Sequence, residues 1–170
     1  LLHDLRSVTK SIVSTLVGVA QMRGALHSVD DRVLGFFPWY EPHDDRQRAL
    51  TVRNLLEMRT GIGWREWPYD SKSDVLRMAA SSNWVEYILD RPMSEPPGTT
   101  FRYVGAAPHL LSAVLTRTTG QTAENFAKAT LFKQLGIGQW SWAQDPCGNS
   151  TGESGLSLAP RDVARIGYLY

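Results

Sequence analysis

A serine and a lysine lie three positions apart near the start of the chain, in the sequence Ser7-Val8-Thr9-Lys10. Positions i and i+3 share one face of a helix, so the hydroxyl and the amine can meet. A serine becomes a useful nucleophile when a base takes its proton, and burial favours the neutral amine that can do so. The pair indicates nucleophilic catalysis by Ser7 with Lys10 as base. The competing interpretation is a helix-capping serine followed by a solvent-exposed lysine, because four-residue patterns often arise by chance.

A largely apolar helix is expected to carry this pair, from about Ser7 to about Arg23. Apolar residues recur at helical spacing on two stripes, which indicates a helix buried on most sides. These residues are Val8, Ile12, Val13, Leu16, Val17, Val19 and Ala20. Gly24 follows at the position of a C-cap glycine. At the start of the helix, free N–H groups and the helix dipole stabilise negative charge. We therefore expect the backbone N–H of Ser7 to help bind an oxyanion.

The rest of the chain is predicted to be mainly helix and loop, with few strands. Polar caps and glycines delimit further helices over 51–58, 74–80, 84–90, 107–118 and 122–134, and Pro160 opens the last one. Either Ser82 or Asn83 caps the helix at 84–90. Trp140 and Trp142 alternate with polar residues, which is typical of a short strand. The chain contains no internal repeat and no linker, so these elements are expected to form one unit.

The composition limits the function classes. The chain has 170 residues, of which 42% are hydrophobic and 21% charged, as in one globular domain. Its net charge of +1 gives no bulk attraction to nucleic acid or to an anionic membrane. The longest apolar stretch, 12–20, is too short to span a bilayer. Cys147 is the single cysteine, so no internal disulfide can form. The four histidines lack ligand spacing, and we expect neither metal nor cofactor.

Longer blocks of sequence follow the serine–lysine pair in a fixed order along the chain. They read RSVTKSIVSTLVGVAQMRGAL, SVDDRVLGFFP, LTVRNLLEMRTGIGW, PPGTTFRY, HLLSAVLTRTTGQTAENFAKATLFKQLGI and GLSLAPRDVARIGYLY. In this order they resemble the superfamily of class C β-lactamases and D-alanyl-peptidases, over nearly the whole chain. Within it, the chain is most similar to the branch of esterases and amide hydrolases that includes 6-aminohexanoate-dimer hydrolases.

The resemblance implies an α+β fold, in which an antiparallel sheet is flanked by helices and this chain supplies mainly the helical part. It also implies a serine hydrolase that forms an acyl-enzyme on an amide, ester or β-lactam carbonyl of a small-molecule substrate. The alternative is a relative that keeps the fold but only binds or senses a ligand. The sequence leaves localisation and oligomeric state open.

The resemblance further assigns Tyr103 to the tyrosine of the family's Tyr-x-Asn motif. A tyrosine near a lysine ammonium can be held as phenolate, and it can take a proton from Ser7 or pass one to the leaving group. The chain departs from the motif at its third position, where Gly105 replaces asparagine. The amide that would contact Lys10 and the substrate is absent, although a water molecule could take its place. This departure favours the non-catalytic alternative.

The family's third motif, Lys-Thr-Gly or His-x-Gly on an edge strand, has no counterpart in the chain. In the family that strand supplies an oxyanion-hole N–H and docks the substrate. Residues 1–170 are therefore expected to be a partial domain, which lacks the N-terminal strands and the C-terminal sheet with the third motif. An isolated piece of this kind could be inert.

Four residues complete the expected substrate site. By position in the family, the loop with Ser154 and Gly155 borders the cleft, and Gly105 lies beside Tyr103. Trp64 belongs to an aromatic loop that also holds Trp67 and Tyr69. For this loop an acyl pocket and ordinary packing are equally good interpretations.

Overall fold

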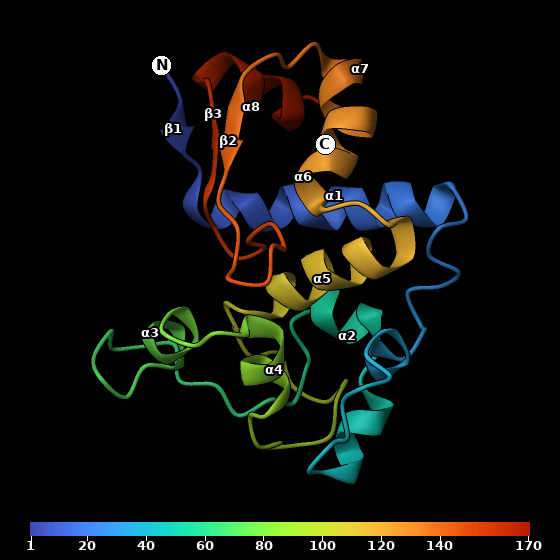
Figure 1. Cartoon of the computed structure of the whole chain (residues 1–170), viewed down its shortest axis with the longest axis vertical. Helices are drawn as coiled ribbons and strands as arrows, with labels where there is room; N and C mark the ends of the chain where they lie inside the picture. The colour runs from blue at the N-terminus through green and yellow to red at the C-terminus, as the bar shows by residue number, and fades with distance from the viewer.

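The computed structural model describes residues 1–170 and shows a mostly helical molecule with a small sheet at one end (Figure 1). The helices are α1 (Thr9–Met22), α2 (Val52–Leu56), α3 (Asp74–Ala79), α4 (Trp84–Leu89), α5 (Ala107–Thr119), α6 (Ala123–Ala127), α7 (Lys133–Leu135) and α8 (Pro160–Gly167). The strands are β1 (His3–Asp4), β2 (Trp140–Trp142) and β3 (Leu156–Leu158). Short 3₁₀ segments cover Arg6–Val8, Val33–Phe36 and Asp45–Ala49, and a π-helical segment covers Lys128–Phe132.

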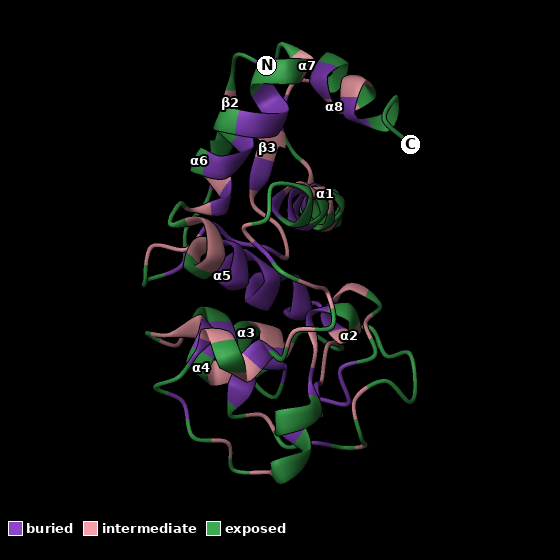
Figure 2. Ribbon diagram, turned by 90° about the vertical axis from the view of Figure 1, so that its right-hand side faces the viewer, coloured by how far each residue is buried: buried purple, intermediate pink, exposed green.

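Helices α1 and α5 lie side by side and form the centre of the core (Figure 1). The apolar stripe of α1 is buried, including Ile12 and Leu16, which have no exposed surface. Helix α5 is buried over nine successive residues, 107–115, as its purple colour shows in Figure 2. This burial accounts for apolar residues on most faces of both helices. None of the helices has both the length and the apolar character needed to cross a bilayer.

The α-helix that follows the serine begins two residues later than expected, at Thr9 instead of Ser7. Ser7 lies in a 3₁₀ turn, because the preceding residue, Arg6, has a φ of 49°. This left-handed conformation is uncommon for a residue with a Cβ. It turns the chain sharply from strand β1 into α1. Lys10 still follows Ser7 by about one helical turn.

The three strands form an antiparallel sheet in the order β1-β3-β2. His3 pairs with Leu158, which in turn pairs with Trp140. The strand at Trp140–Trp142 is confirmed, whereas β1 and β3 have no counterpart in the sequence prediction. Strands of two and three residues are too short for a period of two to be visible. The sheet brings the start of the chain, next to Ser7, against the segment that follows Ser154.

Several local predictions are confirmed. Thr51 and Asn54 form a capping box at the start of α2, and the Asn83 side chain accepts from the backbone N–H of Glu86 at the start of α4. Gly120 ends α5 with a φ of 69°. The helix expected over 122–134 is present, but a π-helical segment interrupts it. There the Thr130 hydroxyl donates to the Phe126 carbonyl over 2.6 Å and competes with the backbone for that acceptor.

Candidate active site

Ser7, Lys10 and Tyr103 meet at one point, although Tyr103 is 96 positions from Ser7 in the sequence. The Lys10 amine donates to Ser7 Oγ over 3.1 Å, and Ser7 Oγ lies 3.1 Å from Tyr103 Oη. The amine also lies 5.5 Å from the centre of the Tyr103 ring. The serine hydroxyl therefore has two groups within hydrogen-bond distance that can exchange protons with it.

The turn that carries Ser7 is held from both sides. Before it, the backbone N–H of Leu5 donates to the Leu156 carbonyl over 2.8 Å. The left-handed Arg6 is fixed by Asp4, whose carboxylate accepts from the Arg6 backbone N–H at 2.9 Å and pairs with its guanidinium at 3.0 Å. Left-handed residues with a side chain are strained and cluster at functional sites. Nothing in the sequence marks this conformation, so the prediction missed it.

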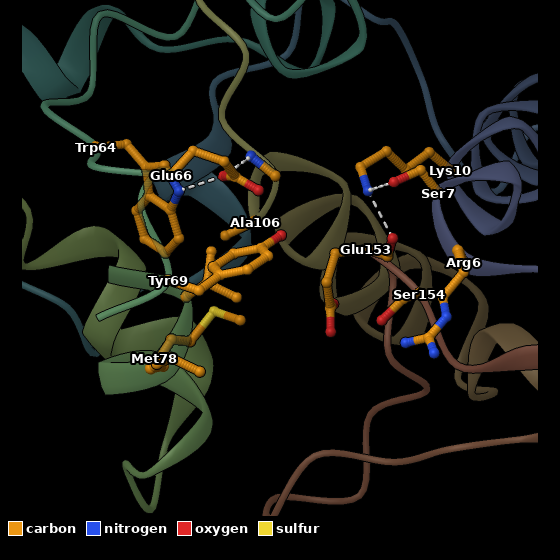
Figure 3. Close-up of a pocket in the computed structure, with 13 residues that line it drawn as sticks. Arg6, Ser7, Lys10, Trp64, Glu66, Tyr69, Met78, Ala106, Glu153 and Ser154 are labelled. Atoms are coloured by element: carbon orange, nitrogen blue, oxygen red, sulfur yellow. Dashed lines mark hydrogen bonds between the residues drawn. The ribbon is translucent and has the colours of Figure 1, made fainter. Parts of the chain in front are cut away.

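Lys10 is fixed by a backbone carbonyl that the sequence analysis did not identify. Its amine donates to the Glu153 carbonyl over 2.5 Å as well as to Ser7 Oγ (Figure 3). The two acceptors lie on different elements, the turn before α1 and the loop before β3. Because both engage the amine, its position beside Ser7 is set by the meeting of these two elements.

The loop that contains Glu153 depends on two glycines for its shape. A Cβ on Gly152 would lie 2.1 Å from the Pro108 carbonyl oxygen, so this residue allows the loop to touch α5. Gly155 has a φ of 84°, and a Cβ there would lie 2.6 Å from Thr151 Oγ1. The Thr151 hydroxyl donates to the Ser154 carbonyl over 2.6 Å. Gly155 therefore shapes the loop and does not line the cavity, whereas Ser154 does.

Behind this loop lies a buried group of titratable side chains. His109 is fully buried, and its Nε2 lies 3.0 Å from Asp145 Oδ2. Its Nδ1 accepts from the Gly152 N–H at 3.4 Å and lies 3.7 Å from Glu153 Oε2. The imidazole therefore lies between two carboxyl groups, Asp145 on its Nε2 side and Glu153 on its Nδ1 side.

The pKa values of the two carboxyl groups in this buried cluster, those of Glu153 and Asp145, are displaced in opposite directions. Burial raises the pKa of Glu153, and the nearby His109 and Lys10 only partly oppose this effect. Burial also acts to raise the pKa of Asp145, but hydrogen bonds from His109 and Asn149 outweigh it and hold the pKa below its usual value.

A cavity of about 370 Å³ opens beside the serine (Figure 3). Its lining contains Arg6, Ser7, Lys10, Trp64, Glu66, Tyr69, Val75, Leu76, Met78, Gly105, Ala106, Glu153 and Ser154. Of the aromatic loop, Trp64 and Tyr69 line the cavity. Trp67 is 63% exposed and packs against Tyr69 with ring centroids 4.0 Å apart. No group of three or more His, Cys, Asp or Glu residues is arranged to hold a metal ion.

The carboxylate of Glu66 lies where the side chain of a residue at position 105 would begin. The carboxylate of Glu66 accepts from the Gly105 N–H at 2.9 Å and from Trp64 Nε1 at 2.7 Å, both on Oε2 (Figure 3). A Cβ on Gly105 would lie 2.5 Å from Glu66 Oε1. The carboxylate thus occupies the space of a Cβ at Gly105, while the hydrogen bonds of Lys10 go to Ser7 Oγ and the Glu153 carbonyl. A water molecule in place of the asparagine amide stays a prediction. The alternation Trp-x-Glu, which puts both side chains on one side of an extended segment, was the available signal.

The model of the Beta-lactamase family matches residues 1–167. The chain belongs to the beta-lactamase family. The resemblance seen in the sequence blocks is thereby confirmed, and so is the α+β class, of which this chain shows a mostly helical part. A search among curated proteins finds no match.

Solved structures share the fold of this beta-lactamase family member at low sequence identity. A protein from Bacillus anthracis assigned as a 6-aminohexanoate-dimer hydrolase superposes with a TM-score of 0.83 at 16% identity, over 99% of this chain and 47% of its own. A D-alanine carboxypeptidase from Burkholderia cenocepacia gives 0.70 at 17% identity, over 98% and 48%. A D-stereospecific amidohydrolase from Streptomyces gives 0.73 at 17% identity, over 98% and 59%. The chain thus spans about half the length of these three proteins.

Proposed function

We propose that this protein is a serine hydrolase that forms an acyl-enzyme on Ser7. The observation that carries the proposal is the position of Ser7 Oγ, 3.1 Å from both the Lys10 amine and the Tyr103 hydroxyl, at a cavity. Because a nucleophile needs a base within hydrogen-bond reach, this geometry fits covalent catalysis better than a structural serine. Membership of a family with hydrolase relatives supports the same reaction class.

In the first half-reaction a neutral Lys10 amine takes the proton of Ser7 Oγ, which forms a bond to the carbonyl carbon of the substrate. A neutral amine has two N–H groups and one lone pair. With one N–H directed to the Glu153 carbonyl, the lone pair is free to face the serine. The oxyanion that develops on the substrate is stabilised by backbone N–H groups, among which we place that of Ser7.

The tetrahedral intermediate then collapses, and the bond to the leaving oxygen or nitrogen breaks. Tyr103 is 38% exposed and its hydroxyl lies 3.1 Å from Ser7 Oγ, so it can pass a proton to this leaving group. The proton that Lys10 took from Ser7 then replaces the one lost by Tyr103, and Lys10 is neutral again. In the second half-reaction the neutral Lys10 takes a proton from water, which attacks the seryl ester. The acid is released when the ester bond breaks, and Ser7 Oγ takes the proton back from Lys10.

The substrate class that we propose is a small amide, ester or β-lactam. One side of the cavity carries mainly charged and hydroxyl side chains, among them Lys10, Ser7 and Ser154, and the other carries mainly apolar and aromatic ones, among them Trp64 and Met78 (Figure 3). This lining suits a carbonyl compound with an apolar part. The alternative, a ligand-binding relative without turnover, is favoured only by the loss of the asparagine amide at Gly105.

The test is the pre-steady-state release of p-nitrophenol from a p-nitrophenyl ester by the full-length protein, followed by turnover of amides and β-lactams. We expect a burst equal to the enzyme concentration, which Ser7→Ala abolishes. Ser14→Ala is the matched control, since Ser14 is an exposed serine on the same helix. A burst that survives in Ser7→Ala would place the nucleophile elsewhere. Binding of substrates without any burst or turnover would favour the alternative.

A further inference from the structure

Tyr103 lies in a segment that has almost no regular structure. Residues 101–104 belong to no helix or strand, and the only side-chain hydrogen bond of Tyr103 is with Ser7 itself. Its position must therefore be set by the backbone on either side. On one side the Arg102 N–H donates to the Met58 carbonyl over 2.9 Å, and on the other the Gly105 N–H donates to Glu66 over 2.9 Å.

The Glu66 carboxylate is itself anchored. Its Oε2 accepts from the indole of Trp64, which is 7% exposed and packs edge-on against Tyr87. One oxygen thus joins a buried side chain of the aromatic loop to the backbone two residues after Tyr103. The carboxylate has no lysine, arginine or histidine within 4.0 Å, so holding these two N–H groups is its evident structural use.

Gly105 is part of the same arrangement. Its φ lies outside the left-handed region, so glycine is not needed there for conformational freedom. It is needed for space, because a Cβ would lie 2.5 and 2.7 Å from the two carboxylate oxygens of Glu66. The glycine and the carboxylate therefore depend on one another.

We propose that Glu66 is a positioning residue, which holds Tyr103 against Ser7 by binding the backbone of Gly105 and thereby supports proton transfer. This inference deepens the proposed function and rests on it for its kinetic effect. Glu66 does not need to touch the substrate. Since a misplacement of about 1 Å can cost about a hundredfold in rate, loss of this contact should be visible in the acylation step.

The experiment compares Glu66→Ala with Glu66→Gln in the full-length protein. Alanine removes the acceptor and is expected to lower the acylation rate constant about tenfold to a hundredfold at saturating substrate, with KM changed less than threefold. Glutamine keeps a carbonyl oxygen that can accept from both N–H groups and should recover most of the rate. An acylation rate in Glu66→Ala equal to that of the unmodified protein would overturn the proposal, as would an equal loss in both variants.

A second comparison separates positioning from general damage. In a Tyr103→Phe background the phenolic group is gone, so Glu66→Ala should cause no further loss. A full additional loss in that background would show that Glu66 acts by another route and would overturn the proposal.

A crystal structure of Glu66→Ala gives a readout that does not depend on turnover. We expect Tyr103 Oη to leave hydrogen-bond distance of Ser7 Oγ. If it stays at about 3.1 Å, the positioning role is refuted even if the protein proves not to be a hydrolase. Absence of an ester burst in the unmodified protein would instead count against the proposed function alone.

Discussion

The substitution Gly105→Asn is expected to lower the rate of acylation, although it restores the family's motif. The Cβ of any residue there would lie 2.5 Å from Glu66 Oε1, 2.7 Å from Oε2 and 2.9 Å from Cδ. Real Cβ atoms do not approach other atoms so closely, so the carboxylate must move away. Because one carboxylate oxygen accepts from both the Gly105 N–H and the Trp64 indole, we expect this shift to disturb the two contacts together.

The size of the effect follows from these contacts. One hydrogen bond to a charged group contributes about 1.5–3 kcal/mol, and each ~1.4 kcal/mol is a tenfold change in rate. Loss of one such bond from the reacting geometry corresponds to about a tenfold to hundredfold slower acylation. If the loss appears in stability instead, the same free energy lowers the melting temperature by roughly 3–12 °C in a protein of this size.

The assay is the stopped-flow burst with a p-nitrophenyl ester, together with the melting temperature of each variant. Gly138→Asn is the matched control, since a Cβ there would meet no atom within 4 Å. The double variant Gly105→Asn with Glu66→Ala should be no slower than either single one, because both act on one carboxylate. Acylation by Gly105→Asn that equals or exceeds that of the unmodified protein would refute this reasoning.

Other parts of the site give further expected outcomes. Lys10→Met removes the proposed base and should slow acylation by about 10²–10⁴-fold; a burst of unchanged rate would exclude that role. Gly152→Ala should lower the free energy of unfolding by about 1–3 kcal/mol, measured by urea denaturation, because its Cβ would overlap the Pro108 carbonyl; an unchanged midpoint would contradict it. For Glu153 the pKa is raised in the folded protein, so its contribution to stability is complete below the ordinary value of 4.5 and is lost as the pH rises through the folded pKa. As the pH rises through this range, the melting temperature of the unmodified protein should therefore fall relative to that of Glu153→Gln. A constant difference between the two melting temperatures at all pH values would contradict the burial argument.

Local features of the site could be predicted from the sequence. The i, i+3 spacing predicted that the Ser7 hydroxyl and the Lys10 amine lie on one side of the chain, because residues three apart are neighbours on a helix. Caps such as Thr51 and Asn83 could be predicted for the same reason, since their bonds reach only three residues ahead. The role of Tyr103 was predicted from the resemblance to the family, because no local pattern around this residue indicates it.

The features that the sequence did not predict depend on contacts between distant segments. The Glu153 carbonyl is 143 positions from Lys10, and a backbone acceptor leaves no mark on residue type. The Glu66 carboxylate reaches Gly105 across 39 positions, so the loss of the asparagine was visible but the contact of Glu66 with Gly105 was not. The left-handed Arg6 is held by Asp4 and by the pairing of β1 with β3, and arginine gives no sign of a positive φ.

The central claim is that Ser7 becomes covalently acylated, and locating the modified residue tests it most directly. The full-length protein is treated with a fluorophosphonate, digested and sequenced by tandem mass spectrometry. We predict a single phosphonylated residue, Ser7, and no adduct in Ser7→Ala under the same conditions. An adduct on another residue, or one of equal yield in Ser7→Ala, would contradict the account.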